Sequence, residues 1–298
     1  MARAFPALAA LSLFAAGCGS AAARPPAATK PHHAALKRIG SLPHAISKAS
    51  AVALPNGRVL IIGGLVGNSS IDTIAKLTAT EHVIGHLPQP THDAAAAVLN
   101  GLVYLFGGGE SVSEPTVVRI NPANGATTGA APIGEPLSDE GAVTIGGRVY
   151  LVGGYTGSEF ATAILRYGSS GTPAVVARLP QGTRYAGVAA IGRTIYVVGG
   201  LTTSGPTSAI YAFPLGGRLR RIGTLPRPEA HAALAALNGT LYYVGGRRIL
   251  AINPRTGKST IAARLPASLA DPSVVAAGNA VVIAGGGTNG IWSLSPAG

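Results

Sequence analysis

Acidic, basic and aromatic side chains recur at one fixed place in a repeating pattern, eight residues before the second residue of a tight turn. That position is occupied in turn by Ala49, Asp93, Asp139, Tyr185, His231 and Asp271. Further ionisable side chains stand beside it or two residues before it, namely Lys48, His92, Glu140, Arg184 and Glu229. Carboxylates and imidazoles can transfer protons, and an arginine can clamp an anion. The set therefore suits a small-molecule or glycan site, provided that the fold brings it together.

Arg184 and Tyr185 are the pair in this set with the most definite chemistry. A guanidinium beside an aromatic ring can hold a carboxylate through two parallel hydrogen bonds while a sugar packs on the ring. One alternative is an ion pair from Arg184 to Asp139 or Glu140 that only ties neighbouring repeats together. A second alternative is that none of these residues binds a ligand. Residues at the start of strands around a water-filled channel are polar in any case.

The elements that must position these side chains are marked by a short apolar run that ends in two glycines. The run occurs six times, ending at Gly63-Gly64, Gly107-Gly108, Gly153-Gly154, Gly199-Gly200, Gly245-Gly246 and Gly285-Gly286. The steps between the first glycines are 44, 46, 46, 46 and 40 residues, which indicates a repeat architecture. Each run has about five residues and is rich in Val, Ile, Leu and Tyr, so it predicts a buried strand rather than a helix.

A tight turn lies six residues before each glycine pair and predicts a β-hairpin in every repeat. Asn56-Gly57, Asn100-Gly101 and Asn238-Gly239 are the pairs that favour type I′ turns, because both positions need a positive φ. The first strand of the hairpin is rich in small residues, as in 94–98 and 232–236. Alanine favours helices, but each run stops at the turn within a few residues, so we predict strands.

A third and a fourth strand complete each repeat. Residues 116–120 are typical of the third strand, and the fourth usually ends in Leu-Pro, as at Leu87-Pro88. Four strands in each of six repeats predict an all-β, six-bladed β-propeller. Residues 36–43 nearly duplicate the fourth strand at 219–226, and the chain stops soon after a third strand at 290–294. We therefore expect the N-terminal strand to complete the last blade, which closes the ring and hides both edges.

Apolar runs that end in Gly-Gly, once per blade, resemble Kelch repeats, and the resemblance covers about residues 36–298. Kelch blades usually carry a tyrosine soon after the glycines and a tryptophan several residues later. Tyr155 and Trp292 fit these positions in two blades, and the other blades have neither. The resemblance implies a propeller that binds its ligand at the mouth of the central channel.

Two enzyme types with Kelch-like propellers can be compared with the residues of this chain. Galactose-oxidase-like copper enzymes need a cysteine cross-linked to a tyrosine, and Cys18 is the single cysteine and lies in the leader, which argues against that activity. Sialic-acid epimerases of this fold use carboxylate and arginine groups at the channel. Glu140 or Glu229 could act as a general base and Arg184 as an anion clamp. A sugar-modifying enzyme is therefore the alternative to a binding or scaffolding module.

The N-terminus is typical of an export signal. Residues 5–16 form an apolar run after a short basic start, which predicts a signal peptide over 1–17. The sequence Ala15-Ala16-Gly17-Cys18 resembles a bacterial lipobox, although leucine is usual at the place of Ala15. We expect Cys18 to be acylated and the Ala/Pro-rich residues 18–35 to be a flexible tether, with 36–298 as the propeller. An ordinary secretory signal with an incidental cysteine is the alternative.

The composition limits the partners. Among 298 residues, 23 Lys and Arg against 11 Asp and Glu leave a formal charge of +12, which draws a protein to anionic surfaces. Export argues against nucleic acid, so we expect anionic lipid, a wall polymer, a glycan or a protein as partner of a monomer on the outer face of the cell membrane. The single cysteine excludes an internal disulfide and a Cys-based zinc site. His82 and His86 would be about 13 Å apart on a strand, so we expect no metal and no cofactor.

Overall fold

The computed structural model describes Met1 and residues 34–168 and 171–296, and all regular structure in these ranges is β-strand. The predicted signal peptide, Cys18 and the tether up to residue 33 lie outside the described residues. No helix in the described part of the chain is long and apolar enough to cross a membrane.

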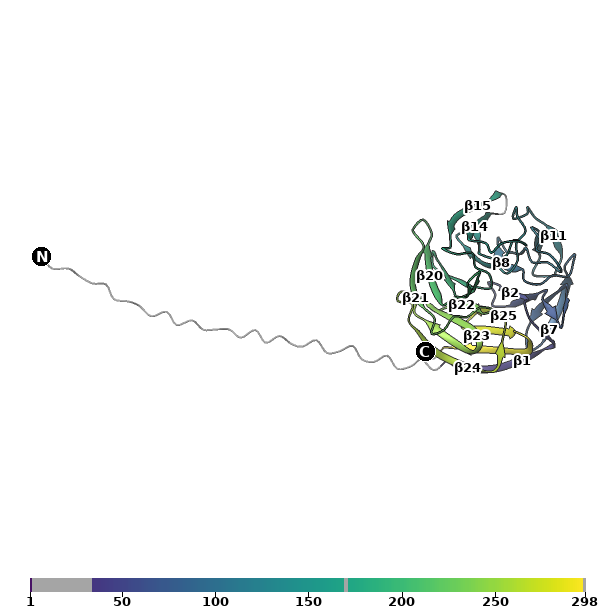
Figure 1. Cartoon of the computed structure of the whole chain (residues 1–298). Helices are drawn as coiled ribbons and strands as arrows, with labels where there is room; N and C mark the ends of the chain where they lie inside the picture. The colour runs from purple at the N-terminus through teal and green to yellow at the C-terminus, as the bar shows by residue number, and fades with distance from the viewer. Residues whose placement is uncertain (2–33, 169–170, 297–298) are drawn as a thin grey trace. The chain divides into compact units, whose positions relative to one another are not determined.

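The strands form six sheets around a common axis, which confirms the predicted six-bladed β-propeller (Figure 1). From the axis outward, blade 1 contains β2 (Ser50–Ala53), β3 (Val59–Ile62), β6 (Thr73–Leu77) and β7 (Glu81–His86). Blade 2 contains β8 (Ala95–Leu99), β9 (Leu102–Phe106), β10 (Val117–Ile120) and β11 (Thr127–Gly129). Blade 3 contains β12 (Gly141–Ile145), β13 (Arg148–Val152), β14 (Ala163–Gly168) and β15 (Gly171–Arg178).

The second half of the chain repeats this plan. Blade 4 contains β16 (Gly187–Ile191), β17 (Thr194–Val198), β20 (Ala209–Pro214) and β21 (Arg220–Thr224). Blade 5 contains β22 (Ala233–Leu237), β23 (Thr240–Ile252) and β24 (Ser259–Leu269). Blade 6 contains β25 (Pro272–Ala277), β26 (Ala280–Gly285), β27 (Thr288–Ser295) and β1 (Ala35–Ile46). Two small hairpins follow the glycine pairs of blades 1 and 4, namely β4 (Leu65–Val66) with β5 (Ser69–Ser70), and β18 (Leu201–Thr202) with β19 (Gly205–Pro206).

The N-terminal strand closes the ring as predicted. β1 pairs antiparallel with β27, and Leu36 lies opposite Leu294 while Arg38 lies opposite Trp292. This pairing makes β1 the outermost strand of blade 6 and fastens the start of the propeller to its end. Hydrogen bonds along β27 are thereby satisfied on both sides.

The alanine-rich runs are strands that surround the channel, as predicted. The innermost strands contact one another in the order β2, β8, β12, β16, β22, β25 and back to β2. They line a central cavity of about 340 Å³ with Ala, Val, Leu and a single Thr. Inward hydroxyls also join neighbouring blades, since Ser50 Oγ donates to Ala94 O at 2.5 Å and Thr144 Oγ1 to Val98 O at 2.7 Å. Small side chains fit here because six strands converge on one axis.

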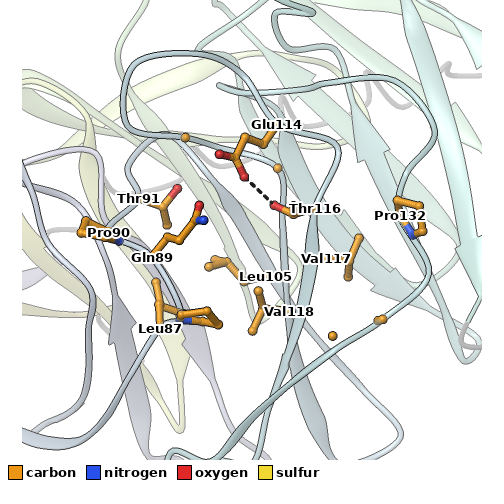
Figure 2. A pocket seen from close by; sticks show the side chains of 15 residues that line it. Leu87, Gln89, Pro90, Thr91, Leu105, Glu114, Thr116, Val117, Val118 and Pro132 are labelled. Atoms are coloured by element: carbon orange, nitrogen blue, oxygen red, sulfur yellow. Dashed lines mark hydrogen bonds between the residues drawn. The ribbon is translucent and has the colours of Figure 1, made fainter.

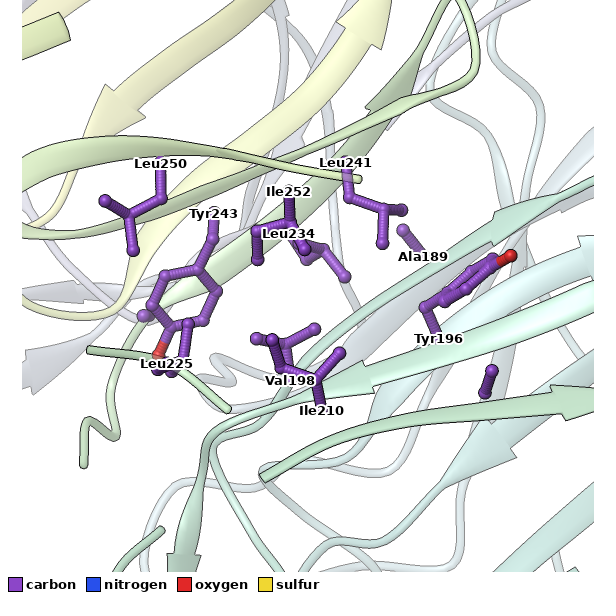
Figure 3. Packing of buried hydrophobic residues seen from close by; sticks show 12 residues of the cluster. Ala189, Tyr196, Val198, Ile210, Leu225, Leu234, Leu241, Tyr243, Leu250 and Ile252 are labelled. Atoms are coloured by element: carbon purple, nitrogen blue, oxygen red, sulfur yellow. The ribbon is translucent and has the colours of Figure 1, made fainter. Parts of the chain in front are cut away.

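The hydrophobic core lies between the blades rather than in the channel. Between blades 4 and 5, Val198 and Ile210 face Leu234, Tyr243 and Leu250, and these side chains are nearly inaccessible to solvent (Figure 3). Similar clusters fill the other interfaces between blades. Burial of these flat apolar faces is the main stabilising term of the fold.

The glycine pairs follow the second strands, where the chain turns away from the sheet and passes very close to neighbouring backbone. Gly107 and Gly108 have φ of +55° and +73°. A Cβ on Gly108 would lie 2.7 Å from both Ala94 Cβ and His92 O, so no larger residue fits.

Two features differ from the predicted pattern. In blade 5, β23 includes the residues of both the second and the third strand, and its first half pairs with β22 while its second half pairs with β24. The outermost strands β24 and β1 continue beyond their Leu-Pro dipeptides instead of ending there. A proline is tolerated on an edge strand because its missing N–H faces solvent.

Candidate functional site

One residue from each blade bends the chain sharply at the mouth of the channel. These six rim residues have φ between 51° and 61°, and they are Lys48, Asp93, Asp139, Tyr185, His231 and Asp271. Backbone hydrogen bonds join five of the six neighbouring pairs, as when Asp93 N donates to Lys48 O at 3.1 Å and Asp139 N to Asp93 O at 2.8 Å, and the pair Tyr185 and His231 is the exception. A positive φ is strained for a lysine or a tyrosine, so these hydrogen bonds help to hold the backbone of the rim in place.

In blade 1 the rim residue is not the one that the sequence pattern predicted. The fixed offset places Ala49 at the rim, but the structure places Lys48 there. The cause is a hairpin that is one residue longer, in which Leu54 N donates to Arg58 O and Asn56-Gly57 does not form a two-residue turn. Asn100-Gly101 and Asn238-Gly239 have positive φ at both positions, as type I′ turns require.

Six of the ten predicted ligand-binding residues line one pocket of about 360 Å³ beside the channel mouth. They are Lys48, His92, Asp93, Asp139, Arg184 and Tyr185. The other walls are formed by Ser138, Tyr155 and the loop at 108–113 that follows the glycine pair of blade 2. We call this cavity the rim pocket. Residues from blades 1 to 4 meet in it, which the repeat pattern predicted.

Arg184 is fixed by three kinds of contact. Its Nη2 lies 2.6 Å from Asp139 Oδ2 and donates to Tyr185 Oη at 2.8 Å. Its guanidinium carbon lies 4.6 Å from the centre of the Tyr155 ring and 4.5 Å from that of Tyr185. Such stacking of a guanidinium on aromatic rings holds its plane in one orientation. The ion pair with Asp139, which was one of the open alternatives, is therefore present.

Lys48, Asp93 and Tyr185 form a second network in the rim pocket. Lys48 Nζ lies 2.7 Å from Asp93 Oδ2 and donates to Tyr185 Oη at 3.3 Å. Burial opposes the charge of Lys48, but the bond to Asp93 outweighs it and raises the lysine's pKa. Burial, with the Asp93 and Asp139 charges, raises the pKa of Tyr185 to about 12, so the phenol keeps its proton. That hydroxyl donates to Asp93 Oδ2 at 3.4 Å.

Asp139 is the group in the rim pocket that is best suited to exchange a proton near neutral pH. Its side chain is only 1% exposed. Burial and the neighbouring Asp93 carboxylate raise its pKa to about 7, although Arg184 acts in the opposite direction. A carboxyl group with such a pKa can serve as a general acid or base.

His92 lies at the edge of the same pocket. Its Nδ1 is 2.8 Å from Ser70 Oγ, and its Nε2 is 3.6 Å from Asp93 Oδ2. Burial lowers the pKa of His92, so its ring is neutral at pH 7 and can accept or donate a hydrogen bond.

Glu140 follows the rim residue Asp139 and lies deeper in the channel. It lines a cavity of about 110 Å³ just below the mouth. The equivalent positions in the other blades hold small apolar residues, namely Ala49, Ala94, Ala186, Ala232 and Pro272. Neither carboxyl oxygen of Glu140 has a hydrogen-bond partner among the described residues. Burial raises the pKa of Glu140 well above its usual range, which favours the protonated, neutral form of the carboxyl group.

No known protein family and no curated protein matches this sequence. Among solved structures, one described as the structure of YjhT is similar to the chain, with a TM-score of 0.74. The two proteins share a fold. The alignment covers 87% of this chain and 96% of YjhT at 16% sequence identity. Such low identity shows the fold alone, so the function has to be argued from the residues of this chain.

The remaining predicted residues lie outside the rim pocket. Glu229 lies 3.4 Å from Arg248 and 3.8 Å from Arg227, next to blade 5. His231 Nδ1 lies 2.9 Å from Asp271 Oδ1, and this hydrogen bond raises the pKa of His231. The His231 ring also packs on Tyr185, with 4.1 Å between the ring centres. His231 and Asp271 are rim residues that lie on the other side of the channel mouth from the rim pocket. Glu229 lies outside both the rim and the rim pocket.

The sequence reasoning missed the loop at 108–113, Ser138 and the role of Tyr155. The loop after the glycine pair has the same length in blades 1 to 4 but a different composition in every blade, so no periodic pattern of residue types points to its side chains. Tyr155 carried a signal, because it matches the Kelch tyrosine, but its contact with Arg184 of the next blade depends on how the blades pack.

A larger cavity of about 410 Å³ lies on the side of blade 2 (Figure 2). Its walls include Leu87, Pro90, Leu105 and Val117, and its Glu114 accepts a bond from Thr116 at 3.3 Å. No second ionisable side chain lines it, so it lacks the converging charges of the rim pocket. Within residues 34–168 and 171–296, no three His, Cys, Asp or Glu side chains are grouped as metal ligands.

Proposed function

We propose that this protein is a Kelch-type binding module that holds a glycan in the rim pocket. The observation that carries the proposal is the convergence of Lys48 and Arg184, from opposite sides, on the same polar cavity. Both cations are held in place before any ligand arrives, which lowers the entropy cost of binding. Their acidic partners are Asp93 and Asp139, and Asp139 is about half protonated near pH 7. Glu110 also lines the pocket, so its net charge is close to zero. The two fixed cations, rather than an overall positive charge, would hold a sugar that carries a carboxylate, from a free glycan or a wall polymer.

The ligand would contact Tyr185 through its hydroxyl rather than its ring. His231 and Arg184 already pack against that ring, at 4.1 and 4.5 Å from its centre. The sequence-based proposal of a sugar stacked on Tyr185 is therefore replaced by hydrogen bonds between the sugar and Tyr185 Oη or His92, and by hydrogen bonds that Arg184 donates to the sugar.

A binding screen tests the proposal. The purified protein would be titrated by calorimetry with neutral sugars, with sugars that carry a carboxylate and with wall fragments. We expect binding of a carboxylate-bearing sugar that Arg184→Ala weakens at least tenfold. Arg166→Ala removes an exposed arginine on β14 and serves as the matched control. Equal affinity of Arg184→Ala and wild type for every ligand found would contradict the proposal.

A sugar-modifying enzyme, of the sialic-acid epimerase type, is the second candidate. Asp139 favours it, because its raised pKa and its contact with Arg184 place an acid–base group beside an anion clamp. Glu229 has no part in this version, since it lies outside the pocket. Incubation of candidate sugars in deuterated water, followed by NMR, would detect proton exchange at carbon. Absence of exchange for every sugar that binds would exclude the enzyme and leave the binding module.

The cellular address in this proposal rests on the sequence. The protein is exported, acylated at Cys18 and held as a monomer on the extracytoplasmic face of the cell membrane. Replacing Cys18 by Ser removes the acylation site, so we expect high salt to release the variant from the membrane fraction, whereas the acylated protein stays there until detergent is added. Intact-mass measurement checks the modification directly. A mature chain that begins after Cys18, without a lipid, would contradict this address.

A further inference from the structure

The cations of the propeller are concentrated in one half of the ring. The strands of blades 4 to 6, with the loops between them, are residues 187–296 together with β1, and they carry 12 Lys and Arg against 2 Asp and Glu. The intervening residues 47–186 carry 8 against 9. One half of the propeller therefore has a formal charge of +10 and the other of −1. A field of this strength attracts an anionic surface of matching size.

Most of these cations are exposed and lack an acidic partner. Eleven of the twelve are exposed, Arg248 being the exception. Only Arg227 and Arg248 lie within ion-pair distance of a carboxylate in the part of the chain that the structure describes. Arg248 and Arg264 even lie directly opposite each other on β23 and β24. Two like charges in cross-strand positions destabilise a sheet, so their presence favours a role outside folding.

Six of the cations lie on the outer strands that follow one another along the circumference of the ring, or one residue before such a strand. They are Lys37, Arg38, Arg220, Arg221, Lys258 and Arg264, and we call them the cationic edge. Figure 1 shows β21, β24 and β1 in succession along this side of the propeller. The backbones also meet there, because a Cβ on Gly223 of β21 would lie 2.8 Å from Gly257 Cα, and β24 contacts β1.

The chain enters the propeller on this same edge. β1 begins at Ala35, and Lys37 and Arg38 follow within three residues. Anything that holds the N-terminal segment is therefore attached beside the cationic edge. The rim pocket lies instead at the mouth of the channel, so a surface against the edge leaves the pocket open.

We propose that the cationic edge docks on the anionic lipid headgroups of a membrane surface. The inference goes beyond glycan binding in the rim pocket and needs no acyl group on Cys18. Each Lys or Arg near an anionic bilayer strengthens binding by roughly fivefold, and this attraction fades with salt. A lipid surface that faces β24 has the cations of β21 and β1 on either side of the contact, so all three outer strands contribute to the attraction.

Vesicle sedimentation with the full chain carrying Cys18→Ser tests the docking without a lipid anchor. We expect binding to vesicles that mix phosphatidylglycerol with phosphatidylcholine, no binding to phosphatidylcholine alone, and release by high salt. The variant Arg220→Gln/Arg221→Gln/Lys258→Gln/Arg264→Gln should lose at least tenfold in affinity. The matched control Arg58→Gln/Arg148→Gln/Arg166→Gln/Arg178→Gln removes the same charge from exposed sites in blades 1 to 3 and should change affinity by less than about twofold.

Three results would overturn the docking proposal. Equal losses in the two quadruple variants would show that net charge alone, and not the edge, attracts the vesicles. Failure of the Cys18→Ser chain to bind mixed vesicles would remove the lipid as partner. Binding of a soluble polyanion such as heparin without binding of vesicles would assign the edge to a polymer. Far-UV circular dichroism of each variant checks that it is folded, and glycan binding in the rim pocket is measured separately, so that the two proposals can fail independently.

Discussion

At the scale of single residues, Arg184 combines a structural and a functional part. Its ion pair with Asp139 joins two blades, and its face contacts Tyr155 and Tyr185. An alanine at this position therefore removes ligand contacts and also leaves a buried carboxyl group without its partner. The pH at which the variant is studied separates the two effects.

Arg184→Ala is expected to destabilise the protein more at pH 8 than at pH 6. The folded-state pKa of Asp139 is already raised to about 7, so its contribution to stability falls as pH rises from its ordinary value through 7. Without Arg184 the buried carboxylate of Asp139 has no cationic partner. We therefore expect the free energy of unfolding to fall by about 3 kcal/mol at pH 8 and by less at pH 6. Urea unfolding at both pH values measures it. The double variant Arg184→Ala/Asp139→Asn should recover most of the loss, and a loss that is the same at both pH values would contradict this account.

Glu140 gives a second prediction at this scale. Its pKa is raised in the folded state, so the folded protein binds the proton more tightly and loses stability as pH rises above the unfolded value. Glu140→Gln mimics the protonated acid, and we expect it to stabilise the protein by about 1–3 kcal/mol at pH 8 with a smaller gain at pH 5. Thermal melts across this range measure the effect. A gain that does not change with pH would show that folding does not raise the pKa of Glu140.

At the scale of elements, β1 decides whether the ring is closed. Deleting residues 36–43 removes the strand that pairs with β27 and exposes Trp292 and its neighbours. We expect a loss of about 4 kcal/mol or more, since several ladder hydrogen bonds and the packing of Leu36 are removed together. Thermal melting and light scattering measure stability and association, because a bare edge invites pairing with another chain. An unchanged melting temperature and a monomeric elution profile would contradict the role of β1.

At the scale of the whole molecule, the propeller separates two kinds of surface. The axis gathers one rim residue from every blade, and the rim pocket contains those of blades 1 to 4, so acids, bases and aromatics lie within a few ångströms of one another. The circumference repeats outer strands side by side, which turns scattered arginines into a continuous cationic edge. A ligand at the axis and a surface at the circumference can be bound at the same time, because neither covers the other.

The sequence by itself determined the fold and the ring of candidate residues. Six glycine pairs at a near-constant period predict six blades, because each marks the end of the same strand. The duplicated segment at 36–43 predicts closure for the same reason, since a fourth strand without three others has to join the blade that lacks one. The fixed offset from each turn also predicts that Asp93, Asp139 and Tyr185 converge, because equivalent positions of a propeller surround one axis.

Only the tertiary structure decided which of these residues act together. A single extra residue in the first hairpin moved the rim position from Ala49 to Lys48, and no sequence period reveals such a shift. The guanidinium of Arg184 lies between aromatic rings from two blades, and Glu140 is buried at a tier where the other blades hold Ala or Pro. Contacts of this kind depend on how neighbouring sheets pack and on loops that differ in every blade. Periodicity places the strands, but the distances between side chains of different blades arise only when the ring is closed.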